Sequence, residues 1–167
     1  MKLYDQILDK DPENIDALSS KAQCLQKIDS NSFPKALKLY EKALELDEKD
    51  FETNFNIGIL YYQRKQQEDM EKALTYLKKA NELDPFNKIV LYDIAVIHEE
   101  KEEYALAEEY YRKLLKVDAK NVRVLVNLGV WLDKMGNFSE AEGIYNEAIK
   151  SSDKDPKVFN NLAVNLK

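Results

Sequence analysis

Small residues recur at near-constant intervals along the chain, and this recurrence restricts the fold more than any other feature. Ala22, Gly58, Ala95, Gly129 and Ala163 are separated by 36, 37, 34 and 34 residues. Around them, larger apolar residues follow the i, i+3, i+4, i+7 spacing of one helix face, as Leu125, Leu128, Gly129 and Leu132 do. The pattern predicts a series of similar helical units.

Each unit contains a second helix-like run after a short break. In residues 127–150, "NLGVWLDKMGNFSEAEGIYNEAIK", the first run carries Gly129 and the second carries Ala141, Tyr145 and Ala148. The "GN" at positions 136–137 tolerates a turn between the two runs. Helices approach each other most closely where their side chains are small. We therefore expect a helical hairpin whose two helices cross near Gly129.

A hairpin with this period and this order of large and small residues resembles the tetratricopeptide repeat family. The resemblance implies an all-α fold, a right-handed α-solenoid (superhelix) of antiparallel helical hairpins. We expect a single array over residues 1–167, divided into a second-helix half repeat at 1–11, repeats at 12–47, 48–84 (with a lengthened turn), 85–118 and 119–152, and a first-helix half repeat at 153–167. Half repeats at both ends suggest a piece of a longer array.

Local signals support these helix boundaries. Asp–Pro pairs at 11–12, 84–85 and 155–156 are read as helix starts, with Asp as the capping residue and Pro in the first turn. Two of the intervals, of 36 and 37 residues, are longer than 34, and their additional residues fall near "IDSNSF" and "KQQEDM". This predicts longer turns there with intact helix packing. Lys21, Asn54 and His98 depart from the family pattern, which prefers apolar or aromatic residues at these positions.

Charge and composition exclude several classes of protein. The net charge of −6, without a cluster of Lys and Arg, argues against a nucleic-acid partner. No apolar stretch is long enough for membrane insertion, and no signal segment is recognised. One cysteine, Cys24, cannot form an internal disulfide, which fits a reducing compartment. We expect a cytoplasmic protein.

Residues for catalysis are few. The chain has one histidine, so His–His metal sites are excluded, and His98 lies on a packed helix stripe. There is no CxxC pair, and the four glycines form no phosphate-binding loop. We interpret the acidic runs as solvated helix faces. The sequence predicts no enzyme, with no catalytic residue, no metal and no cofactor.

A second stripe on the first helix of each hairpin is not needed for the hairpin core. The resemblance implies that these stripes line the concave face of the superhelix. The candidate peptide-binding residues are Phe55, Asn56, Ile59, Tyr62, Tyr92, Asp93, Val96, Val126, Asn127, Val130, Asn161 and Val164. Apolar side chains offer pockets, and an amide both donates to and accepts from a peptide bond.

Two interpretations of this stripe stay open. In the first, the chain is a non-catalytic scaffold that binds an extended peptide or a helix of a partner protein. The groove carries Asp93, Glu99 and Asp133, so a partner with basic residues is favoured. In the second, the stripe packs against neighbouring hairpins, and the array is structural, associating with its parent chain or with copies of itself through open repeat ends. A Lys/Arg clamp for a C-terminal carboxylate is not present.

Overall fold

The computed structural model describes residues 1–28, 32–66 and 68–152 of the chain. These residues form nine α-helices, and they contain no β-strand. The helices are α1 (Lys2–Lys10), α2 (Ile15–Ile28), α3 (Phe33–Leu46), α4 (Phe51–Arg64), α5 (Asp69–Leu83), α6 (Lys88–Glu100), α7 (Tyr104–Val117), α8 (Val122–Lys134) and α9 (Phe138–Ser151). The predicted all-α architecture is confirmed for this part of the chain.

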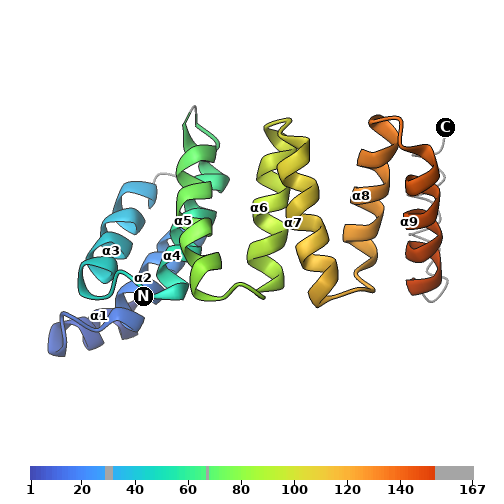
Figure 1. Cartoon of the computed structure of the whole chain (residues 1–167). Coiled ribbons are helices and arrows are strands. Elements are labelled where there is room, and N and C mark those ends of the chain that lie inside the picture. Colours follow the sequence, from blue (N-terminus) through green and yellow to red (C-terminus); the bar gives the residue numbers. More distant parts are fainter. Residues whose placement is uncertain (29–31, 67, 153–167) are drawn as a thin grey trace. The chain divides into compact units, whose positions relative to one another are not determined.

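Consecutive helices pair into hairpins, as Figure 1 shows for α2 with α3, α4 with α5, and α8 with α9. In the next pair, the hydroxyl of Tyr111 on α7 donates a hydrogen bond to Glu99 on α6 at 2.6 Å. The chain divides into two units, residues 1–90 and residues 91–167, and the division falls within α6.

Glycine allows the helices of a hairpin to approach closely. A Cβ atom added to Gly58 on α4 would lie 2.6 Å from Leu77 Cγ on α5. A Cβ atom added to Gly129 on α8 would lie 2.7 Å from Tyr145 Cδ1 on α9. Both distances are far shorter than a carbon–carbon contact of 3.5–4.0 Å. The prediction that the small residues lie at the crossing of two helices is confirmed at these positions.

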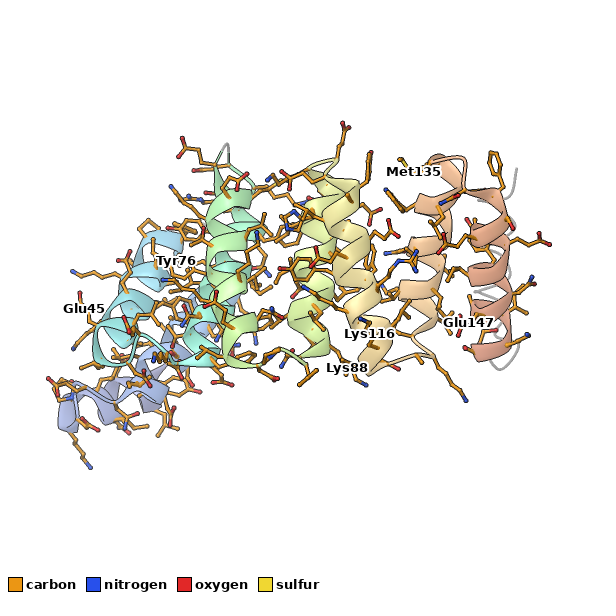
Figure 2. All side chains as sticks on the ribbon, viewed as in Figure 1. Glu45, Tyr76, Lys88, Lys116, Met135 and Glu147 are labelled. Atoms are coloured by element: carbon orange, nitrogen blue, oxygen red, sulfur yellow. The ribbon has the colours of Figure 1, made fainter. Side chains whose placement is uncertain are left out.

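Aromatic rings fill the space between the paired helices. Tyr40 and Tyr111 have no more than 1% of their surface exposed. Tyr61 on α4 stacks with Tyr76 on α5 at 6.1 Å between ring centroids, and Tyr76 is labelled in Figure 2. Because such rings bury large apolar areas, the repeated tyrosines belong mainly to the core.

The turns between hairpins correct the predicted helix starts. Asp11 and Asp84 are not N-caps; they follow the last residues of α1 and α5. Their carboxylates accept hydrogen bonds from the side-chain amides of Asn14 and Asn87, three residues further on. Asn14 then caps α2 by accepting the N–H of Ala17, and Asn87 caps α6 by accepting the N–H of Val90. The Asp-Pro pair at 155–156 lies outside the described residues.

An ion pair with a buried carboxylate joins the end of α4 to the start of α5. Residues 65–68 separate α4 from α5, whereas residues 101–103 separate α6 from α7. Arg64 donates to both carboxylate oxygens of Asp69, at 2.7 and 2.5 Å, and its guanidinium lies 3.6 Å from the ring centroid of Phe33. Only 1% of Asp69 is exposed. Arg64 and Asp69 therefore tie the end of α4 to the start of α5.

The three departures from the family pattern each have a polar partner. Asn54 is fully buried, and its amide donates to the carbonyl oxygens of Glu48 and Asp50 at 3.0 and 2.8 Å. Lys21 forms an ion pair with Asp5. His98 is buried, and its Nδ1 lies 2.6 Å from a carboxylate oxygen of Glu103. A polar partner thus takes the place of an apolar contact at these positions, although Asn54 Oδ1 and His98 Nε2 are buried without a hydrogen bond from the described residues.

Candidate functional site

The first unit has a shallow depression beside α4, which we call the unit 1 hollow. Its volume is about 180 Å³, and it is lined by Gln23, Phe51, Glu52, Phe55, Asn56, Asn87 and Ile89. Two of the candidate residues, Phe55 and Asn56, lie here together. Phe55 stacks with Phe51 at 6.2 Å between centroids. Apolar rings and side-chain amides therefore share one small surface.

A row of polar contacts joins α2 and α4 next to this hollow. Ser19 and Thr53 share a buried hydrogen bond of 2.5 Å. Gln23 donates to Asn56 Oδ1 at 3.5 Å, and Gln26 donates to Gln63 at 2.8 Å. The Asn56 amide nitrogen has no acceptor within the described part of the chain. The Asn56 oxygen thus has one long contact, and the amide donor is left for another group.

The other two candidates on α4 do not line the unit 1 hollow. Ile59 and Tyr62 are half-buried further along the helix. The ring of Tyr62 lies 5.1 Å from the ammonium of Lys65, which follows the last residue of α4. Because Ile59 lies four residues after Phe55 and Tyr62 three after Ile59, the two residues continue the same face of α4 outside the hollow.

The second unit has a larger depression between α6 and α8, which we call the unit 2 hollow. Its volume is about 350 Å³, and it is lined by Tyr92, Val96, Glu99, Glu100, Tyr104, Asn127, Val130, Trp131 and Lys134. Four candidate residues, Tyr92, Val96, Asn127 and Val130, come together in it. Residues four apart on a helix share a face, so α6 contributes Tyr92 and Val96 from consecutive turns. The volume is at the lower end of the range for ligand pockets, about 300–1,000 Å³.

A chain of hydrogen bonds anchors the polar side of the unit 2 hollow. Asn127 Nδ2 donates to the hydroxyl of Tyr111 at 3.2 Å, and this hydroxyl donates to Glu99 Oε2 at 2.6 Å. Burial raises the pKa of Tyr111, and the hydrogen bond to Glu99 adds to this effect, so its hydroxyl stays protonated. Asn127 Oδ1 accepts no hydrogen bond from any residue in the described ranges. Asn127 is held by its nitrogen and keeps its acceptor.

Asp93 and Val126 lie beside the unit 2 hollow and do not line it. Burial raises the pKa of Asp93 to about 6, and the positive charge of Arg123 opposes the effect. The Arg123 guanidinium lies 4.4 Å from the ring centroid of Tyr92. Val126 packs against the core cluster of Leu128, Leu132, Ala141 and Tyr145. Val130 and Trp131, which line the hollow, pack against the same cluster. Asn161 and Val164 lie outside the described residues.

Several lining residues were not among the candidates. Trp131 lies four residues after Asn127, so the helical period alone could have found it. Glu99 lies three residues after Val96, and the sequence predicted it only as a charge that favours a basic partner. Tyr104 begins α7, and no periodicity in α6 or α8 points to it. Its place depends on the geometry of the α6–α7 turn.

The groups that could serve catalysis are used in packing. The His98 ring stacks with Tyr110 at 5.8 Å between centroids, and Cys24 is half-buried. Across residues 1–28, 32–66 and 68–152, no three His, Cys, Asp or Glu side chains gather as a metal site requires. Among the described helices, none combines the length and apolar character needed to cross a bilayer.

Comparison with protein families agrees with this architecture. A TPR repeat model matches residues 25–65, and two tetratricopeptide repeat models match residues 66–121 and 99–163. Together, the matches run from residue 25 to residue 163. The chain belongs to the tetratricopeptide repeat family, and its fold is an all-α tetratricopeptide repeat solenoid. Proteins of this class are built for protein–protein interaction, and their extended surfaces bind other chains.

Solved structures share the fold at low sequence identity. A MamA crystal structure has a TM-score of 0.79 at 20% identity, covering 92% of this chain and 87% of that one. YrrB, a TPR protein with an unusual peptide-binding site, has a TM-score of 0.78 at 20% identity, covering 97% of this chain and 81% of that one. PilF from Pseudomonas aeruginosa has a TM-score of 0.74 at 23% identity, covering 93% of this chain and 68% of that one.

A human relative is far longer than this chain. The human protein O-mannosyl-transferase TMTC3 is 32% identical over 108 residues, which are 65% of this chain. The chain spans 11% of the length of that protein. The similarity is therefore confined to a small part of the human sequence.

Proposed function

We propose that the chain is a non-catalytic scaffold that binds an extended peptide, or a helix of a partner protein, through the faces of the first helices that carry the unit 1 hollow and the unit 2 hollow. One observation carries the proposal. In the unit 2 hollow, Tyr92, Val96, Asn127 and Val130 share a single depression, and the Asn127 carbonyl oxygen is left without a donor from the described residues. This combination suits a ligand that brings both apolar side chains and backbone N–H groups.

Each unit offers one asparagine to a peptide backbone. Asn127 keeps an acceptor for a peptide N–H, and Asn56 keeps a donor for a peptide C=O. Asn127 is held in place by its other amide atom, so little of its side-chain freedom is lost on binding. Phe55 and Tyr92 lie beside the two asparagines and supply apolar area. Aromatic residues of this kind often contribute most of the affinity in protein interfaces.

The charges of the same face favour a partner with basic residues. Glu99 and Glu100 line the unit 2 hollow, and Asp93 lies beside it. Opposite charges on a ligand speed its association and select it over acidic competitors. We therefore propose a basic peptide as the ligand. YrrB, which shares the fold, is described with a peptide-binding site, and this supports a peptide as the kind of ligand.

The test is a selection of displayed random peptides with the purified chain, followed by affinity measurements on the enriched peptides. Tyr92→Ala and Phe55→Ala should weaken binding by about 1–2 kcal/mol each, because they remove buried aromatic area. Phe138→Ala is the matched control, since Phe138 is 67% exposed at the start of α9 and lines neither hollow. It should leave affinity unchanged.

Two results would contradict the proposal. Enriched peptides that bind the Tyr92 and Phe55 variants as tightly as the wild type would place the binding surface elsewhere. A failure to enrich any peptide, together with concentration-dependent dimers in analytical ultracentrifugation, would instead favour a structural array that associates with copies of itself.

A further inference from the structure

The unit 2 hollow has aromatic side chains from three helices. Tyr104 at the start of α7 and Trp131 on α8 lie 6.2 Å apart between ring centroids, with 41° between their planes. Tyr92 on α6 lines the same hollow. The faces of aromatic rings carry partial negative charge and attract cations, with tryptophan the strongest of the three types. The Tyr92 ring already has the Arg123 guanidinium 4.4 Å from its centroid, so the Tyr104 and Trp131 rings are the pair that favours a positively charged guest.

Carboxylates add negative charge to the same hollow. Glu99 and Glu100 line it from the end of α6, and Lys134 is the single basic residue among its lining residues. The Glu99 carboxylate is fixed by the hydrogen bond from the buried Tyr111 hydroxyl. A carboxylate that is already oriented loses less entropy when it pairs with a cation.

We infer that the unit 2 hollow is a pocket for one cationic side chain, an arginine or a lysine, of the bound protein segment. The inference rests on the proposed function, because it names the group that this part of the binding face selects. The guest's charged end lies against the Tyr104 and Trp131 rings and faces the Glu99 carboxylate. Its apolar stem contacts Val96 and Val130. The volume of about 350 Å³ holds one long side chain and excludes a whole helix.

The same unit already contains this type of contact. The Arg123 guanidinium lies 4.4 Å from the Tyr92 ring centroid, next to Asp93. The Lys113 ammonium lies 4.6 Å from the Tyr110 ring centroid and forms an ion pair with Glu109 at 2.7 Å. In both places a cation lies on a tyrosine ring close to a carboxylate. The unit 2 hollow offers the rings and the carboxylate, and the ligand supplies the cation.

A direct test uses the one tryptophan of the chain as a reporter. The probes are N-acetyl-arginine amide and its neutral isostere N-acetyl-citrulline amide, each titrated while the Trp131 indole N–H signal is followed by nuclear magnetic resonance. The arginine compound should shift this signal in a saturable way, and the citrulline compound should not. Equal shifts from both compounds, or no shift from either, would overturn the inference.

Charge variants give a second test with a matched control. Glu99→Gln keeps an acceptor for Tyr111 and removes the charge, so it should weaken binding of the arginine compound roughly two- to fivefold. Lys134→Glu removes a repulsive charge and should strengthen binding by a similar factor. Lys116→Glu makes the same charge change on α7 outside the hollow, and its effect should be smaller than either. Equal effects of Lys134→Glu and Lys116→Glu would show that binding responds only to the overall electrostatic field of the protein. This result would contradict a pocket.

The inference and the proposed function can fail separately. Suppose that selected peptides bind the face but are not enriched in arginine or lysine, and that Glu99→Gln leaves their affinity unchanged. The binding face then stands and the cation pocket is wrong. If the arginine compound shifts the Trp131 signal while no peptide is selected, the pocket stands and the peptide-binding function is wrong. Thermal unfolding of each variant confirms that the comparison is between folded proteins.

Discussion

The side-chain amide of Asn127 donates a hydrogen bond to the hydroxyl of Tyr111 at 3.2 Å. Tyr111 is a core residue with 1% of its surface exposed, whereas Asn127 is half-buried and lines the unit 2 hollow. The bond therefore connects the hairpin core to the proposed binding face. Replacing Asn127 should therefore reduce both the stability of the fold and the affinity for a ligand.

Asn127→Ala should reduce both properties. Loss of the bond to Tyr111 should lower the free energy of unfolding by about 0.5–1.5 kcal/mol, and loss of the acceptor should weaken peptide binding by a similar amount. Asn56→Ala is the comparison, because its contact with Gln23 is long at 3.5 Å and its stability loss should be smaller. Urea denaturation and isothermal titration measure the two quantities. An Asn127→Ala variant with unchanged affinity would remove this residue from the ligand site.

Gly129→Leu should destabilise the α8–α9 hairpin. The added side chain meets the Tyr145 ring, since even a Cβ atom would lie 2.7 Å from Tyr145 Cδ1, and overpacking of this kind costs about 1–3 kcal/mol. Gly143→Ala on α9 is the control, because nothing lies within 4 Å of its added Cβ. It should gain about 0.5–1 kcal/mol, as alanine favours a helix over glycine. Chemical denaturation measures the stability of both variants. Equal stabilities would show that Gly129 does not lie at the hairpin interface.

Asp69 should make stability fall in acid. The hydrogen bonds from Arg64 lower the pKa of Asp69 below its usual value, although burial opposes the effect. Its stabilising contribution is therefore complete above the unfolded pKa of about 4 and is lost as the pH falls through the folded pKa. Asp69→Asn should cost about 1–3 kcal/mol at neutral pH and much less in acid. Glu68→Gln, which affects an exposed pair with Lys72, should cost less than about 0.5 kcal/mol.

Asp93 should act in the opposite direction. Burial raises its pKa to about 6, so the folded protein binds this proton more tightly than the unfolded chain does. The ionised carboxylate reduces stability above this pKa, and the loss disappears as the pH falls towards 4. Asp93→Asn should therefore stabilise the protein by about 1–2 kcal/mol in mild alkali, allowing for partial contact with water, and have little effect in acid. Denaturation at both pH values checks the sign, and stabilisation that is equal at both would contradict it.

The sequence identified the helices, their pairing and the crossing points because these depend on local periodicity. Apolar residues at helical spacing mark the buried faces. The glycines at positions 58 and 129 mark places where two helices approach each other closely. The same reasoning failed at Asp11 and Asp84, where the pair with Pro looked like a cap. The caps are Asn14 and Asn87, and the Asp side chains orient them. Pattern alone does not show which of two nearby polar residues lies at the helix end.

The contents of the candidate site were decided by tertiary structure. Tyr92, Val96, Asn127 and Val130 could be named from their stripe, but periodicity does not tell which stripe residues face a hollow and which pack inward. Val126 and Val130 both pack against the core cluster, but only Val130 also lines the unit 2 hollow, and Tyr104 reaches this hollow from another helix. A helical period records the direction of a side chain around its own axis. The neighbours that this side chain meets depend on how far apart the helices lie and how the turns between them are built, and only the folded chain determines both.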